Sequence, residues 1–150
     1  MYDNLGLEPV WKRCKVMLVS DAGARIEPDA APAKNWLWHT KRVLDVIDNQ
    51  VRSLRARMLI AAYENHERQG AYWGIRTDIQ EYGLADALPC PKDKTAALAA
   101  IPTRLSRFDE DEQMRLINWG YAVSDAGLRK YVLPGAQAPA GFPYPDAGLG

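Results

Sequence analysis

The pattern of hydrophobic and polar positions along this chain begins with one short apolar run. The run is Cys14–Val19, and it ends at the polar residues Ser20 and Asp21. A mostly apolar run of this length is typical of a strand that is buried on both faces of an α/β sheet. We therefore expect Ser20 and Asp21 to start a loop at the carboxyl edge of the sheet, where ligands bind in such folds. A plain turn is the simpler interpretation.

The segment Trp36–Glu67 has the strongest helical pattern in the chain. It contains no glycine or proline, and Gly70 is expected to end it. Apolar residues step by alternating threes and fours along one face of this helix. We expect this face to pack against the sheet. Its members are Leu44, Ile47, Val51, Leu54, Met58 and Ala61.

A second strand is expected at Ala71–Ile75, which is rich in aromatic residues. The order strand, helix, strand predicts a right-handed parallel crossover. Thr77 and Asp78 would then follow the second strand, near Ser20 and Asp21. A small polar cluster at this edge is one interpretation. A hydrogen-bonded loop is the simpler one, because no histidine or cysteine nucleophile accompanies these residues.

In the C-terminal half, the sequence predicts a short helix at Asp93–Ala100 and a second long helix that begins after Asp109. Asp109 is the expected N-cap, and Glu112 completes a variant capping box. Gly120 and Gly127 interrupt this helix, and close approach by a neighbouring element would compensate for their low helix propensity. The expected packed stripe consists of Met114, Ile117, Tyr121, Ser124, Leu128 and Tyr131.

Two segments lack any periodicity. Ala24–Asn35 contains Pro28 and Pro32 and is expected to be an exposed connection, either a simple linker or a cover over a site. Leu133–Gly150 has four prolines and four glycines among its eighteen residues and is expected to be a disordered tail. The predicted folded part is therefore residues 1–132.

Charge and composition exclude several classes of protein. The 19 basic and 19 acidic residues cancel, so nothing in the charge favours nucleic acid as a partner. No apolar run approaches 18 residues and no secretory signal is present, which predicts a cytoplasmic protein that touches a membrane at most peripherally. Three arginines of the first long helix either meet phospholipid head groups or form a solvated face with salt bridges. They are Arg52, Arg55 and Arg57.

The residues that most often bind metals are few and far apart. Cys14 and Cys90 have no metal-ligand spacing and form no disulfide framework, and Cys14 is expected to be a small buried side chain. His39 and His66 also lack a metal spacing, and no elbow serine is present for either to activate. We therefore expect structural roles for both histidines.

Several runs, met in this order, resemble the C-terminal part of bacterial patatin-like phospholipases. The similarity covers Met1–Leu128. It implies the C-terminal portion of a three-layer α/β/α domain with two long helices and at least two strands. The runs are Tyr2–Trp11 (YDNLGLEPVW), Val16–Ala24 (VMLVSDAGA), Arg42–Leu54 (RVLDVIDNQVRSL), Gly70–Ile79 (GAYWGIRTDI), Thr103–Leu105 (TRL) and Leu116–Ala126 (LINWGYAVSDA).

The resemblance implies a lipid acyl hydrolase with a Ser-Asp dyad and no cofactor. The family's nucleophile lies in a G-x-S-x-G turn, which does not occur in these 150 residues. The family's Asp belongs to an Asp-Gly-Gly or Asp-Gly-Ala motif just before the segment that matches Met1–Asn4, and Asp3 corresponds to the next acidic residue, in the following turn. The family's Gly-rich oxyanion loop is absent too. We therefore assign no catalytic, cofactor-binding or metal-binding residue.

Three functional hypotheses follow. The chain is the C-terminal segment of a patatin-like hydrolase of lipid or phospholipid esters, inactive alone because its nucleophile and Asp lie upstream. Alternatively, it is a non-catalytic lipid-binding or protein-interaction module derived from that fold. An independent enzyme that uses Asp3, Asp21 or Asp78 is the weakest hypothesis, because carboxylates without a nucleophile or metal define no reaction. The expected partners are the upstream half or a second copy, since Cys14–Val19 would lack a neighbouring strand.

Overall fold

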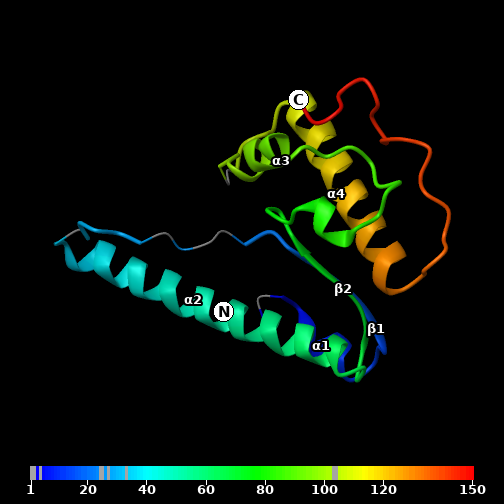
Figure 1. Ribbon diagram of the computed structural model, residues 1–150. Coiled ribbons are helices and arrows are strands. Elements are labelled where there is room, and N and C mark those ends of the chain that lie inside the picture. The colour runs from blue at the N-terminus through cyan, green and yellow to red at the C-terminus, as the bar shows by residue number, and fades with distance from the viewer. Residues whose placement is uncertain (1–2, 4, 24–25, 27, 33, 103–104) are drawn as a thin grey trace. The chain divides into compact units, whose positions relative to one another are not determined.

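The computed structural model describes residues 3, 5–23, 26, 28–32, 34–102 and 105–150. The chain is mixed α/β, as predicted. It divides into two compact units: Met1–Met17 with Ala22–Gln69, and Leu18–Asp21 with Gly70–Gly150. This division differs from the predicted boundary after residue 132. The elements in order are α1 (Leu7–Trp11), β1 (Val16–Asp21), α2 (Trp36–Glu64), β2 (Gln69–Gly74), the 3₁₀ helix η1 (Ile79–Tyr82), α3 (Lys92–Ala99) and α4 (Glu110–Tyr131) (Figure 1).

The two strands form a parallel pair. The N–H of Gln69 donates to the carbonyl of Lys15, and the N–H of Ile75 donates to the carbonyl of Asp21. The two strands therefore run in the same direction. The order β1, α2, β2 therefore makes the predicted parallel strand-helix-strand connection. The predicted loop after Val19 is wrong, because Ser20 and Asp21 continue β1.

The prediction that β1 is buried on both faces is also wrong. Met17 and Val19 are buried, whereas Val16 and Leu18, which alternate with them, are about half exposed. This alternation follows from the period of two in a strand whose second face no described element covers. Cys14 precedes the strand and is exposed, not buried as expected.

Local signals set both ends of α2. At its start, Asn35 Oδ1 accepts a hydrogen bond from the N–H of Leu37 at 2.8 Å. The helix ends at Glu64 and not at Gly70, which lies in β2. After Glu64, His66 adopts a left-handed conformation with φ 58°, and the N–H of Glu67 reaches back to the carbonyl of Ala62. This is a Schellman ending with histidine at the position that glycine usually occupies.

The first unit packs α1 beside the C-terminal half of α2 (Figure 1). Arg55 pairs with Glu8 at 3.7 Å. The hydroxyl of Tyr63 donates to the carbonyl of Met17 at 2.7 Å. The buried side chains of this unit are Leu7, Met17, Leu59 and Ala62, so among described residues the coverage of α2 is confined to its last turns.

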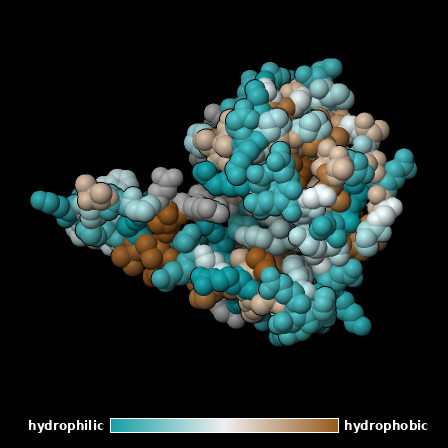
Figure 2. All heavy atoms as spheres, in the orientation of Figure 1, coloured by the Kyte–Doolittle hydropathy of each residue, from teal (hydrophilic) through white to brown (hydrophobic). Residues whose placement is uncertain are grey.

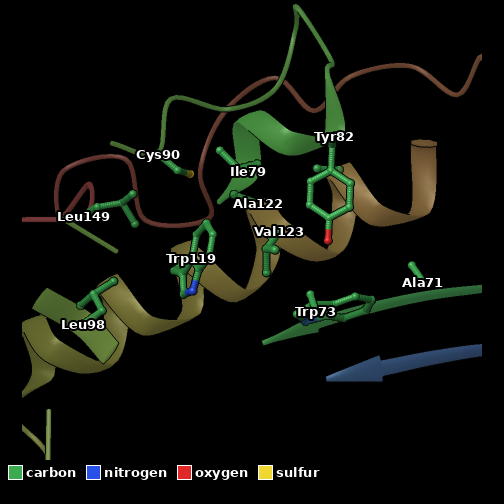
Figure 3. Close-up of a cluster of buried hydrophobic side chains, with 11 residues drawn as sticks. Ala71, Trp73, Ile79, Tyr82, Cys90, Leu98, Trp119, Ala122, Val123 and Leu149 are labelled. Carbon is green, nitrogen blue, oxygen red and sulfur yellow. The ribbon is translucent and has the colours of Figure 1, made fainter. Parts of the chain in front are cut away.

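The core of the second unit forms around α4 (Figure 3). Trp119 is its largest fully buried side chain, and the indole N–H donates to the carbonyl of Ile75 at 3.2 Å. The predicted stripe on α4 is wrong, because Ile117 and Tyr121 are exposed. The buried cluster comprises Ala71, Trp73, Ile79, Tyr82, Cys90, Leu98, Trp119, Ala122, Val123, Ala126 and Leu149.

The two glycines of α4 differ in their surroundings. A Cβ on Gly127 would lie 3.1 Å from the Cβ of Ala71 in β2, so the predicted close approach is confirmed there. A Cβ on Gly120 would meet nothing within 4 Å, so the same prediction is wrong for Gly120. The missing side chain at Gly127 is therefore what leaves room for Ala71 and Trp73 of β2 beside this face of α4.

Gly120→Ala should therefore stabilise the chain, whereas Gly127→Ala should give no gain or a loss. Alanine in an open helical position is favoured over glycine by about 0.5–1 kcal/mol, which corresponds to a rise of about 2–4 °C in Tm. At Gly127 the crowding against Ala71 opposes this gain. Thermal unfolding of the two single variants measures the difference. Equal gains in both would contradict the close packing of α4 on β2.

The shorter segments follow their local sequence. The expected helix at Asp93–Ala100 is present as α3. Asp109 caps α4 as predicted, with Oδ1 accepting from the N–H of Asp111 at 2.9 Å. In the connection 24–35, residues 24, 25, 27 and 33 lie outside the described residues, and the others form no helix or strand before α2. In the TRL run, Thr103 and Arg104 also lie outside them.

The tail is not disordered, contrary to prediction. Leu149 is buried in the core of the second unit. The side chain of Asn118, which is fully buried, donates to the carbonyls of Tyr144 at 2.8 Å and Gly148 at 2.6 Å, and its Oδ1 accepts from the N–H of Tyr144 at 2.9 Å. One buried amide thus fixes the backbone of the tail at Tyr144 and Gly148 with three hydrogen bonds.

Candidate interaction site

The three candidate carboxylates all have structural partners. Asp3 lies in a turn, and its two carboxylate oxygens accept hydrogen bonds from the N–H groups of Leu7 at 2.9 Å and Glu8 at 2.8 Å, at the start of α1. Asp21 Oδ2 accepts from the hydroxyl of Tyr72 at 2.7 Å. These contacts satisfy the carboxylates without placing a nucleophile beside them.

Asp78 begins η1 and does not form a catalytic cluster. Its carboxylate accepts from the N–H of Gln80 and pairs with Lys92 at 3.2 Å, and these contacts lower its pKa. Thr77 Oγ1 accepts from the N–H of Gly74 at 2.9 Å. The simpler interpretation of Thr77 and Asp78, a hydrogen-bonded loop, is therefore confirmed.

The histidines and cysteines form no metal site in the described part of the chain. No group of three or more His, Cys, Asp or Glu side chains there is placed to hold a metal ion. His39 lies exposed in the first turn of α2, and His66 forms the helix ending described above. Cys90 is buried, and burial raises the pKa of its thiol to about 11. A thiol with this pKa is a poor nucleophile at neutral pH.

Among the described residues, the most buried charged side chain is that of Arg129 on α4. Its guanidinium lies 2.7 Å from Asp86 and 3.0 Å from Asp125. The hydrogen bond from Arg129 lowers the pKa of Asp86. Because folding lowers this pKa, the stabilisation is present above the ordinary carboxyl pKa and is lost as the pH falls through the lowered value. The pair fixes the segment after η1 to α4, which is a structural role.

Arg55 and Arg57, two of the three arginines noted on α2, form contacts within the chain. Arg55 pairs with Glu8, and Arg57 Nε donates to the carbonyl of Ser53 at 3.3 Å. Neither contact prepares a phosphate site. No helix in the described residues combines the length and apolar character needed to cross a bilayer.

Comparison of the chain with protein-family models, with curated proteins and with solved structures finds no match. The surface of the chain therefore carries the functional argument. Its most unusual feature lies on α2.

The apolar face of α2 is the strongest candidate for an interaction site. We use this name for Leu44, Ile47, Val51, Leu54, Met58 and Ala61, the stripe that was predicted from the sequence. Leu54 is 61% exposed, Ile47 44% and Met58 41%. Within the first unit, therefore, the predicted burial of this face is wrong. Figure 2 shows apolar surface gathered along the side of this helix.

Local signals favour a helix along the whole length of α2. The helix has 29 residues without glycine or proline, is capped by Asn35, and carries the pair Lys41–Asp45 at 2.7 Å. Exposed apolar stripes of this length are unusual on monomeric proteins and mark surfaces that bind another apolar surface. The first turn adds two exposed indoles, Trp36 and Trp38.

The sheet presents a second uncovered surface. Val16 and Leu18 face outward from β1 with 45% and 48% of their area exposed. Parallel strands are normally covered on both faces by other elements. Within the described residues the sheet has only two strands, so each strand also has an edge with no strand beside it. Such edges pair readily with added strands.

Sequence reasoning found the residues of this site but assigned them the wrong partner. The stepping of threes and fours identified the apolar face of α2, yet it carries no information about which element covers that face. The exposure of Val16 and Leu18 was missed because a mostly apolar run suggests burial on both sides. What the arrangement supports chemically is association with a further apolar polypeptide surface.

Proposed function

We propose that this chain is the C-terminal segment of a patatin-like lipid acyl hydrolase, completed by an upstream polypeptide that supplies the nucleophile, the oxyanion loop and the catalytic Asp. The observation that carries the proposal is the exposed apolar face of α2. A 29-residue helix that leaves such a face open is suited to cover a larger sheet than the two strands here. The resemblance supplies the identity of that sheet, a three-layer α/β/α domain.

The complete domain would act on lipid or phospholipid esters at a cytoplasmic membrane surface. Its serine, deprotonated by the Asp, attacks the ester carbonyl, and the alcohol leaves with a proton to give an acyl-enzyme. Water then hydrolyses this intermediate and releases the fatty acid. No metal takes part. In this scheme the residues of the present chain hold the sheet and its cover in place, in agreement with the structural partners of Asp3, Asp21 and Asp78.

A non-catalytic lipid-binding or protein-interaction module is the second candidate, since an exposed apolar helix also suits a docking module. The coding sequence immediately upstream separates the two. An in-frame G-x-S-x-G and an Asp-Gly-Gly next to Met1 support the hydrolase segment. A start codon preceded by a ribosome-binding site supports the module.

Complementation provides the biochemical test. The 150-residue chain alone should not hydrolyse a chromogenic acyl ester above the uncatalysed rate, because it has no serine elbow. Co-expression with the upstream half should restore hydrolysis and yield a complex of both chains. Replacing the elbow serine of the upstream half by alanine should abolish the activity, and the complex of the two chains should remain associated.

Two outcomes contradict the proposal. If the chain is a monomer that ignores the upstream half, the module is the better description. If the chain alone turns over the ester and loses this activity in Asp3→Ala or Asp21→Ala, it is an independent enzyme.

A further inference from the structure

The second unit contains an apolar cavity that the proposed function does not use. It lies between η1 and the segment that leads into α3, and its volume is about 310 Å³. This is at the lower end of the range for small-molecule pockets, about 300–1,000 Å³. The lining residues are Ile79, Gln80, Leu84, Ala87, Leu88, Pro89, Cys90 and Pro91.

The floor of the cavity is part of the hydrophobic core. Ile79 and Cys90 are both buried, and Figure 3 shows the sulfur of Cys90 directed toward Ile79. Leu84, Ala87 and Leu88 are partly buried against the same cluster. The mouth lies at the surface, because Gln80, Pro89 and Pro91 are exposed.

The walls are held in place by ion pairs on both sides of the cavity. Asp78 and Lys92 pair at 3.2 Å and are the chain neighbours of the first and last lining residues. Asp86, within the wall segment, is held by Arg129 of α4 at 2.7 Å. A cavity with anchored walls costs little reorganisation when a ligand enters.

The chemistry of the lining defines the ligand. Seven of the eight lining residues are apolar, and none is charged or aromatic. A charged group would lose its hydration inside without gaining a partner, and a planar ring would find no ring to stack on. We propose that this cavity binds an uncharged aliphatic chain, with any polar end of the ligand at the mouth beside the amide of Gln80.

The test is a methyl NMR titration of the 150-residue chain with 1-octanol, and with 1,8-octanediol as a probe of the same length that is polar at both ends. Octanol should cause saturable shifts of the methyl groups of Ile79, Leu84 and Leu88. Octanediol should bind at least tenfold more weakly, because one of its hydroxyls would be buried unpaired.

Two alanines of the same segment give matched variants. Ala87→Phe fills the cavity and should weaken octanol binding at least tenfold, whereas Ala85→Phe, at an exposed position outside the lining, should leave it unchanged. If Ala87→Phe does not fold, Gln80→Phe at the exposed mouth tests the same volume.

A second readout uses the thiol. In a Cys14→Ser background Cys90 is the single cysteine, and octanol should slow its alkylation at alkaline pH. The proposal is overturned if octanol shifts only methyl groups of α2, if Ala85→Phe and Ala87→Phe bind alike, or if the diol binds as well as octanol. None of these outcomes depends on ester hydrolysis, so the experiments test ligand binding by the cavity independently of the proposed function.

Discussion

Deletion of residues 133–150 should lower the Tm by about 5 °C. The deletion removes Leu149 from the core, together with the three hydrogen bonds that join the tail to the fully buried side chain of Asn118. Loss of a buried leucine side chain typically costs about 2 kcal/mol or more. In a chain of 150 residues a loss of about 2 kcal/mol corresponds to a shift of this size, which calorimetry should detect.

Two leucines of the tail provide the control. Leu149→Ala removes a core side chain and should reproduce most of the loss, whereas Leu133→Ala, at a position that is 53% exposed, should change the Tm by less than about 1 °C. If the Tm does not change after the deletion, the contacts of the tail with Asn118 and with the core do not stabilise the fold, which would contradict docking of the tail.

The isolated chain should self-associate through the apolar face of α2, and Ile47→Glu should weaken this association at least tenfold. Ile47 lies near the middle of that face and is 44% exposed. A glutamate there would have to lose its hydration in an apolar interface, which is costly. Helix content should stay the same because glutamate is a good helix former. Sedimentation equilibrium measures the change in the dissociation constant, and circular dichroism the helix content.

Ile60→Glu is the matched control. Ile60 is similarly exposed, at 38%, but lies thirteen residues further along, about 220° around the helix from Ile47. The same change of side chain on that side should leave association within about twofold of the unaltered chain. If both variants weaken association equally, the interface is not the apolar face of α2. A chain that is monomeric from the outset would contradict the prediction and would also weaken the case for a missing half.

Local elements were largely predictable because their signals act within a few residues. The absence of glycine and proline predicted α2, and the side chain of Asp109 predicted the start of α4. The end of α2 was misjudged because Gly70 is the obvious stop, whereas the chain uses His66 in a left-handed conformation that few non-glycine residues adopt. The candidate site was predicted only in part: its apolar residues were found, and their exposure was not.

By itself, the sequence determined the approximate places of the two strands and of α2, α3 and α4, that the two strands are joined through a helix, and that no serine elbow is present. Only the tertiary structure decided which faces are buried. On α4 the exposed residue is Ile117 and the buried one is Trp119, whose indole N–H donates to the carbonyl of Ile75. The tail is joined to α4 by the buried amide of Asn118, which exchanges hydrogen bonds with Tyr144 and Gly148. Such burial depends on residues distant in the chain, whereas caps and periodicity depend on neighbours.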